Sequence, residues 1–157
     1  MNVEALNEVK RVLRNVPEDQ FNLSTWWGQS SPDPHTFPPK GGYQDVEKQC
    51  GTTACAIGWA ANDPWFKERG LTIKAYGSAL NEISHLTPVF GESQSFDAVA
   101  AFFDIGYDTA TWLFDPIEYE VSEGGLYPLD EPINIEQVIR RIDMVLADDP
   151  GVGDPCA

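Results

Sequence analysis

Apolar side chains in residues 133–146 recur at the spacing of one helix face, and this periodicity constrains the fold more than any other feature of the sequence. The stripe consists of Ile135, Val138, Ile139, Ile142, Val145 and Leu146. Asn134 and Gln137 have the spacing of a capping box, and Ile133 and Val138 have that of a hydrophobic staple. Such a helix gains most of its stability by burying its stripe, so the pattern predicts a packed helical domain.

A second amphipathic helix is predicted for residues 2–16, with Asn2 as its cap and Pro17 at its end. Its apolar face comprises Leu6, Val9, Val12, Leu13 and Val16. Residues 71–73 and 88–90 are the strand-like runs, and they are expected to pair as a short antiparallel ribbon. The predicted fold class is therefore mainly α, a compact single-domain helical fold with at most one short β-ribbon.

Further helices are predicted in the middle of the chain, over residues 52–61, 75–86, 95–105 and from 108 to about 115. Thr52 or Thr53 would cap the first, which would end at Asp63 and Pro64. Ser95 would cap the third, and Gly106 would supply its left-handed stop. Asp108 would cap the last, with Tyr107 and Trp112 forming a hydrophobic staple.

The length of 157 residues, with 42% hydrophobic and 22% charged residues, fits one globular domain rather than a disordered chain. We expect this domain to span residues 1–150. Residues 28–48 begin with a run rich in Gly, Pro and Ser, which predicts an exposed loop. Residues 151–157 are expected to form a flexible tail.

Negative charge is concentrated in the second half of the sequence. Residues 1–81 hold nine acidic and eight basic side chains, whereas residues 82–157 hold sixteen acidic and two basic ones. From Ala75 to Ile139 there is no Lys or Arg, but there are twelve carboxylates: Glu82, Glu92, Asp97, Asp104, Asp108, Asp115, Glu118, Glu120, Glu123, Asp130, Glu131 and Glu136. Because charges of one sign repel each other, such a face either meets a cationic partner or serves solubility alone.

This charge pattern disfavours direct binding of nucleic acid or of an anionic membrane, since both need basic patches. It predicts a small acidic, non-enzymatic interaction protein that binds a basic host protein, by imitating nucleic-acid phosphate or by blocking a regulator. Tryptophan dominates interface hot spots, so Trp26 and Trp27 beside the Pro-rich loop are candidate anchors. The predicted partner-binding residues are Asp104, Asp108, Asp115, Glu118, Glu120, Glu123, Asp130, Glu131, Trp26 and Trp27.

The most specific local motif runs from Cys50 to Trp59. A thiol just before a helix N-terminus has a lowered pKa and lies near an anion-binding end, which would suit a nucleophile. Zinc is the other chemical alternative, with Cys50, Cys55 and Cys156 joined by His35 or His85. The structural interpretation is that both thiols are small buried hydrophobes at a tight helix start. The residues of this motif that we single out are Cys50, Gly51, Thr52, Thr53, Cys55, Gly58 and Trp59.

Other chemistries have weaker signals. No EF-hand loop, P-loop, dinucleotide fingerprint, serine elbow or H-E-x-x-H motif occurs, and paired carboxylates for glycoside hydrolysis have no sequence signature to select them. The sequence thus predicts no cofactor, no metal and no catalytic residue, with a zinc- or thiol-dependent protein centred on Cys50 and Cys55 as the alternative.

The sequence contains no run of 18 apolar residues, so no membrane span is expected. Its first residues lack the basic start and the apolar run of a signal peptide, so no signal peptide is expected. Three cysteines is an odd count that suits free thiols in a reducing compartment. We therefore expect a cytoplasmic protein. The pattern leaves its oligomeric state open.

Three landmarks in the chain resemble an uncharacterised family of small proteins from bacteriophage and actinobacterial genomes. They are residues 17–26 (P-E-D-Q-F-N-L-S-T-W), residues 50–59 (C-G-T-T-A-C-A-I-G-W) and residues 103–114 (F-D-I-G-Y-D-T-A-T-W-L-F). The resemblance spans most of the chain, and its C-G-T-x-A-C-x-x-G-W core is the specific part. It implies a phage-encoded protein working in the cytoplasm of a host cell, and it implies no activity.

Overall fold

The computed structural model describes residues 1–23, 26, 28–29, 52–77, 83–122 and 133–148. The predicted fold class is confirmed, because helices form most of this part of the chain. The α-helices are α1 (Val3–Leu13), α2 (Ala56–Asn62), α3 (Pro64–Glu68), α4 (Ser95–Phe103), α5 (Tyr107–Phe114), α6 (Pro116–Ser122) and α7 (Ile135–Ala147), with a 3₁₀ turn η1 (Glu18–Gln20). The strands are β1 (Gly28–Gln29), β2 (Thr52–Thr53), β3 (Thr72–Gly77), β4 (Ile83–Phe90) and β5 (Ser93–Gln94).

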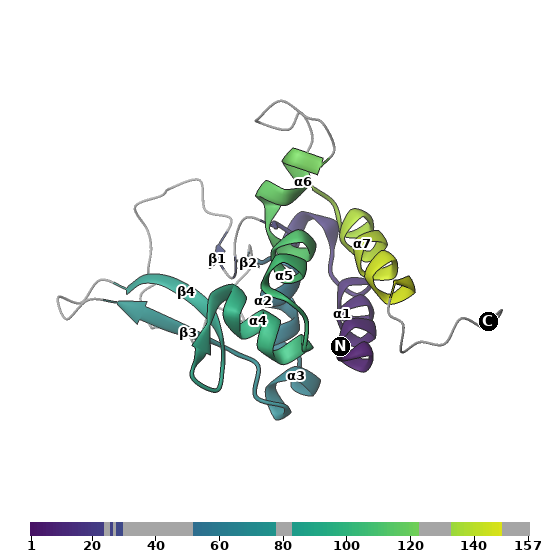
Figure 1. Ribbon diagram of the computed structural model, residues 1–157. Coiled ribbons are helices and arrows are strands. Elements are labelled where there is room, and N and C mark those ends of the chain that lie inside the picture. The colour runs from purple at the N-terminus through teal and green to yellow at the C-terminus, as the bar shows by residue number, and fades with distance from the viewer. Residues whose placement is uncertain (24–25, 27, 30–51, 78–82, 123–132, 149–157) are drawn as a thin grey trace.

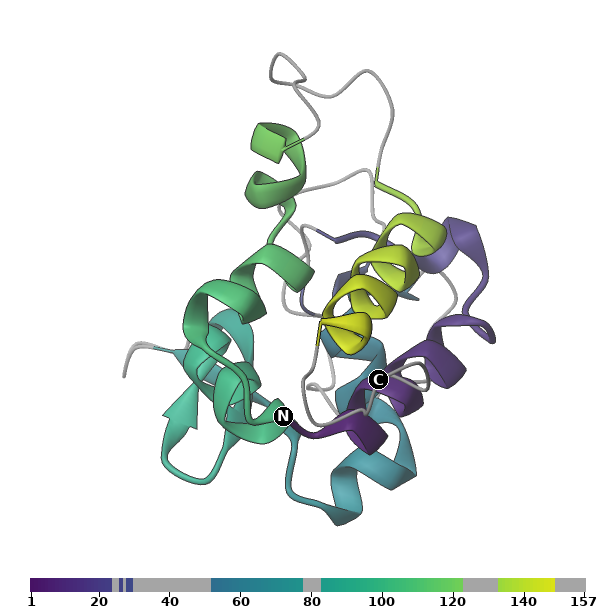
Figure 2. The same ribbon diagram turned by 45° about the vertical axis from the view of Figure 1, so that its right-hand side comes forward.

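Helices α1 and α7 lie side by side, and both have the predicted caps (Figures 1 and 2). Asn2 accepts a hydrogen bond from the backbone N–H of Ala5 at 3.1 Å. Asn134 and Gln137 form the predicted capping box, in which each side chain accepts the backbone N–H of the other residue. The predicted stripes of both helices supply the core: Leu6, Val9, Val12, Leu13, Ile135, Val138, Ile139 and Ile142 are buried.

The β content is a three-stranded antiparallel sheet in the order β3-β4-β5, together with a two-residue pairing of β1 with β2. The predicted pairing of residues 71–73 with 88–90 is confirmed by the partners Thr72 with Val89 and Ile73 with Pro88. The helix predicted for residues 75–86 is wrong, because residues 75–77 and 83–86 extend the same two strands. Cross-strand pairing outweighs a short apolar spacing that also fits a helix.

Two helix starts differ from the prediction. Thr52 and Thr53 form strand β2, and the helix begins at Ala56 with Cys55 as its N-cap. Helix α2 ends at Asn62 with Asp63 as its C-cap, as predicted, and Pro64 then begins a further helix, α3, since its fixed φ suits the first helical position and Asp63 caps it. The chain therefore turns between two short helices at the point where the sequence predicts a stop.

The boundary between α4 and α5 is also shifted. Asp104 takes the left-handed conformation that ends α4, with φ of 51°, whereas Gly106 has φ of −66° and is the N-cap of α5. Asp is among the few non-glycine residues that tolerate this conformation, so the glycine next to it is a weaker guide to the helix end. Ser95 is the first residue of α4, also with positive φ, and Gln94 precedes it as N-cap.

Aromatic rings of α3, α4 and α5 meet at the centre of the core. Phe66 lies 5.6 Å from Phe102 and 6.2 Å from Phe103, and Phe103 lies 5.9 Å from Phe114, measured between ring centroids. These contacts hold α4 and α5 with one face inward and leave the opposite face to carry polar residues. Among the described helices, none has both the length and the apolar character that a membrane span needs.

The predicted domain, loop and tail are covered only in part. Gly28 and Gln29 form strand β1, so the chain is paired at the start of the predicted loop. Residues 30–48 of that loop and the tail at 151–157 lie outside the described residues.

Candidate functional site

The described part of the C-G-T motif contacts residues 20, 22, 26 and 28–29 of the preceding segment. Ala54 exchanges backbone hydrogen bonds with Gln20 and Asn22 at 3.1 and 3.0 Å, and the indole N–H of Trp59 donates to the carbonyl of Gln20 at 3.0 Å. A Cβ at Gly58 would lie 1.6 Å from the carbonyl oxygen of Trp26, so only glycine fits there. Two landmarks of the sequence are thus held against each other, which supports a structural role for this motif.

Cys55 is unsuited to nucleophilic chemistry in the folded protein. Its thiol is buried, and its sulfur accepts the backbone N–H of Gly58 at 3.4 Å. Burial raises the pKa of Cys55 from 9.0 to about 12, and the nearby backbone N–H groups only partly oppose that shift. A neutral thiol of this kind packs as a small apolar group and caps α2.

Several residues of the thiol and zinc alternatives cannot be placed. Cys50, Gly51, His35 and Cys156 lie outside the described residues, and His85 is placed only by its backbone in β4. The part of the chain that the structure describes contains no group of three or more His, Cys, Asp or Glu side chains arranged to hold a metal ion.

The predicted acidic residues that can be placed lie on consecutive helices, α4, α5 and α6, which follow one another as a column in both views (Figures 1 and 2). Asp104 and Asp108 are exposed on either side of the α4–α5 turn, and Asp115 is half-buried where α5 meets α6. Glu118 is half-buried in the first turn of α6. Glu120 is placed by backbone alone, and Glu123, Asp130 and Glu131 lie outside the described residues.

Trp26 lies beside this acidic column instead of standing free of the core. Its ring is half-buried and packs against Phe96 at the start of α4, with 4.9 Å between ring centroids. The two rings border a hollow of about 200 Å³ whose lining also includes Asp115. The structure therefore brings together two predicted partner-binding residues, Trp26 and Asp115, that are far apart in sequence. Trp27 lies outside the described residues.

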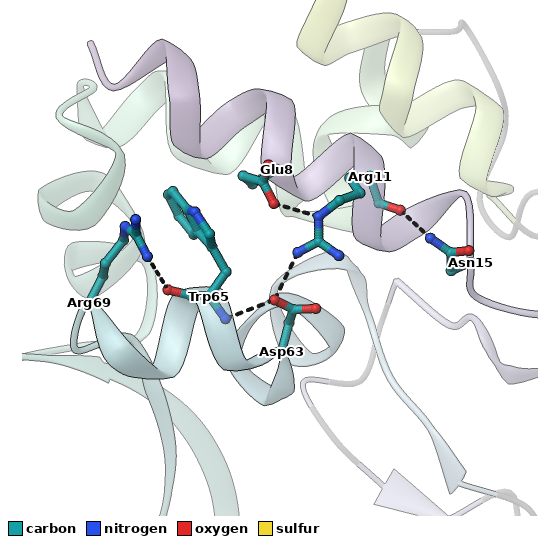
Figure 3. Close-up of polar contacts among 6 residues, drawn as sticks. All are labelled: Glu8, Arg11, Asn15, Asp63, Trp65 and Arg69. Atoms are coloured by element: carbon teal, nitrogen blue, oxygen red, sulfur yellow. Dashed lines mark hydrogen bonds and ion pairs between the residues drawn. The ribbon is translucent and has the colours of Figure 1, made fainter.

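Basic side chains of the first half pair with carboxylates away from this column. Arg11 on α1 bridges Glu8 and Asp63, with 2.9 Å between its Nη2 and the Asp63 oxygen (Figure 3). The ion pairs with Glu8 and Asp63 raise the pKa of Arg11, so its charge is held fixed. Lys10 pairs with Asp143 of α7 at 2.6 Å. These contacts join α1 to α3 and α7, and they leave the charge of the column unopposed by Lys10 and Arg11.

A second hollow, a groove of about 410 Å³, lies between α1, η1 and the end of α2. Arg11, Asn15, Trp59 and Asp63 are among its lining residues. Most of these polar groups already serve the fold: Asn15 donates to the carbonyl of Arg11 at 2.9 Å, and Asp63 accepts the backbone N–H of Trp65 at 3.0 Å (Figure 3). The groove combines apolar and polar lining residues and carries both signs of charge, in contrast to the column of α4 to α6.

Sequence reasoning missed Phe96 as a companion of Trp26. Phe96 follows Ser95, whose φ of 57° is unusual for a residue other than glycine, and this backbone turn sets the direction of the first turn of α4. The only sequence signal is an aromatic residue next to a helix start, which is as typical of core packing as of a binding site.

No protein-family model, curated protein or solved structure matches this chain. What the site can bind must therefore be inferred from its own geometry and charge.

Proposed function

We propose that this protein is a non-enzymatic interaction protein that binds a basic protein through the acidic outer face of α4, α5 and the start of α6. One observation carries the proposal. In a run of 65 positions without Lys or Arg, the described acidic residues Asp97, Asp104 and Asp108 are all exposed, while Phe102, Phe103 and Phe114 of the same helices fill the core.

Electrostatics supports a use of this face in recognition. Asp97 and Asp108 form no ion pair with any described residue, and Asp104, whose side chain is 84% exposed, contacts only the N-terminal amine. A negative field speeds encounter with a positive surface and disfavours partners of the same sign. Proteins that bind nucleic acid carry such positive surfaces, so they are the class of partner that the proposal favours.

Chemistry at the motif supports this choice over the thiol alternative. The buried, protonated thiol of Cys55 caps a helix, and Gly58 and Trp59 pack against the segment that carries Trp26. The contact with Gly58 positions Trp26, which packs against Phe96 at the start of α4.

A binding experiment with charge variants tests the proposal. A protein captured from host lysate would be purified and its affinity measured at several salt concentrations for the wild-type chain and for a triple amide variant. Because screening weakens exposed charges, the affinity should fall steeply between about 50 and 500 mM salt. The variant is Asp97→Asn, Asp104→Asn and Asp108→Asn, and its matched control neutralises three exposed acids of the first half, Glu18→Gln, Asp19→Asn and Glu68→Gln.

The two variants lose the same charge, so they separate the proposed face from net charge. The triple variant of the column should bind at least about tenfold more weakly than wild type, since several rim charges act together, while the control should change affinity by less than about threefold. Equal losses in the two variants, or binding indifferent to salt, would refute the proposed face.

A further inference from the structure

The hollow beside the acidic column has the composition of a receptor for one cationic side chain. Its lining is Leu23, Trp26, Phe96, Phe114, Asp115 and Pro116. At about 200 Å³ it is smaller than the roughly 300–1,000 Å³ of pockets that hold whole small molecules. It therefore suits a single side chain of a larger partner.

The aromatic rings that border the hollow can attract a cation. Trp26 and Phe96 are tilted by 57° to each other with centroids 4.9 Å apart, and Tyr107, which is 52% exposed, lies edge-on to Phe96 at 6.4 Å. The faces of such rings carry negative potential, and tryptophan binds cations best. Apolar neighbours lower the local dielectric and strengthen that attraction.

Asp115 supplies the negative charge at the same place. Its Oδ1 accepts the backbone N–H of Ile117 at 3.0 Å, which fixes the side chain at the start of α6. Among the described residues, none forms an ion pair with Asp115. A fixed carboxylate beside aromatic faces is complementary to a cation with an apolar stem.

The protein stacks its own arginines in this way elsewhere. The guanidinium carbon of Arg69 lies 3.8 Å from the centroid of Trp65, and that of Arg141 lies 3.4 Å from Tyr119 and 4.5 Å from Trp112. A planar guanidinium stacks on a ring and still donates in its plane to a carboxylate, whereas an ammonium is a compact and strongly hydrated charge. The geometry of the hollow therefore favours arginine over lysine.

We propose that this hollow receives an arginine side chain of the basic partner, with its guanidinium on the Trp26 ring and hydrogen-bonded to Asp115. The inference rests on the proposed function, because it names the side chain that the acidic face would recognise. It adds a preference for arginine over lysine, which net charge alone does not give.

Hexa-arginine and hexa-lysine peptides serve as probes, because they have equal charge. Their binding to the full chain would be followed by NMR, using the indole N–H signals and the backbone signals of α4 to α6. Hexa-arginine should bind several-fold more tightly than hexa-lysine, and the indole signal of Trp26 should shift more than that of Trp65.

Asp115→Asn is the main variant, since asparagine keeps the oxygen that caps Ile117 and removes only the charge. Because this variant loses a charge-assisted hydrogen bond, it should bind hexa-arginine about tenfold more weakly than wild type. Asp19→Asn, an exposed acid outside the proposed face, is the matched control and should weaken hexa-arginine binding less than about threefold. Phe96→Leu should weaken hexa-arginine binding more than hexa-lysine binding, and so reduce the preference for arginine.

The possible results separate this inference from the proposed function. If both peptides bind equally and both Asp variants lose the same affinity, the hollow is not an arginine receptor, although the acidic face still binds cations. If the wild-type chain binds neither peptide at low salt, both proposals fail.

Discussion

Replacing Gly58 with alanine tests the contact that positions Trp26. The added Cβ would lie 1.6 Å from the Trp26 carbonyl oxygen, 2.8 Å from its carbonyl carbon and 2.9 Å from the Cβ of Ala54. Two of these three atoms belong to backbone, so rotation of a side chain cannot relieve the overlap. Residues 20–26 must move away from α2, or α2 must shift toward the core.

Movement of that segment strains three hydrogen bonds, Ala54 to Gln20, Asn22 to Ala54 and the Trp59 indole to Gln20, each worth about 1 kcal/mol. Overpacking adds about 1–3 kcal/mol, and the better helix propensity of alanine returns about 1 kcal/mol. We expect the free energy of unfolding to fall by about 3–5 kcal/mol, which lowers Tm by roughly 6–20 °C in a chain of this size.

Urea denaturation followed by circular dichroism measures this loss. Gly106→Ala is the matched control, because Gly106 has φ of −66° and the nearest atom to its added Cβ is Thr109 Oγ1 at 3.9 Å. It should change the free energy of unfolding by less than about 1 kcal/mol, the usual range for alanine at an N-cap. A Gly58→Ala protein as stable as this control would show that the Trp26 carbonyl does not press on α2.

Three further predictions concern packing and caps. Arg141→Ala should lower the free energy of unfolding by about 2–4 kcal/mol, because it removes a buried guanidinium that stacks on two rings and donates to backbone carbonyls, whereas exposed Arg140→Ala should cost under about 0.5 kcal/mol in the same urea assay. The folded pKa of Cys55, about 12, exceeds its ordinary value of 9.0, so the stabilisation by its neutral thiol is full below pH 9.0 and is lost as pH rises toward 12. The difference in the free energy of unfolding between wild type and Cys55→Ala should therefore shrink across that pH range, and a constant difference would contradict this prediction. Asn134→Ala should cost about 1 kcal/mol by removing the capping box of α7, and an unchanged urea midpoint would contradict the cap.

The two terminal helices were predictable because their signals are local. Caps at Asn2 and Asn134 act within one helical turn, and the apolar stripes repeat often enough to exclude a strand. The pairing of residues 71–73 with 88–90 was predictable for a similar reason, since both runs are strand-like in composition. The sequence pattern did not predict that the two strands extend to residues 77 and 83.

The middle of the chain was harder because its short elements depend on distant contacts. The helix expected at residues 75–86 has three apolar residues at helical spacing, but hydrogen bonds between β3 and β4 decide the backbone there. Likewise, Thr52 and Thr53 pair with residues 28–29 instead of capping a helix.

The candidate site divides in the same way. Composition identified the base-free stretch and suggested the acidic residues and Trp26, but it could not pair Trp26 with Phe96 and Asp115, which lie 70 and 89 positions later. It also left open whether Cys55 is reactive, since a thiol's pKa depends on the burial that surrounding elements impose.

The sequence by itself determined the helical class, the caps of the first and last helices and the one-signed charge of the middle stretch, because each depends on residues within a few positions of one another. Tertiary structure decided that Cys55 is a buried cap, that Gly58 must accommodate a carbonyl and that Trp26 borders a hollow beside Asp115. Those properties arise from packing between segments far apart in the chain, where burial and close contact fix what each side chain can do.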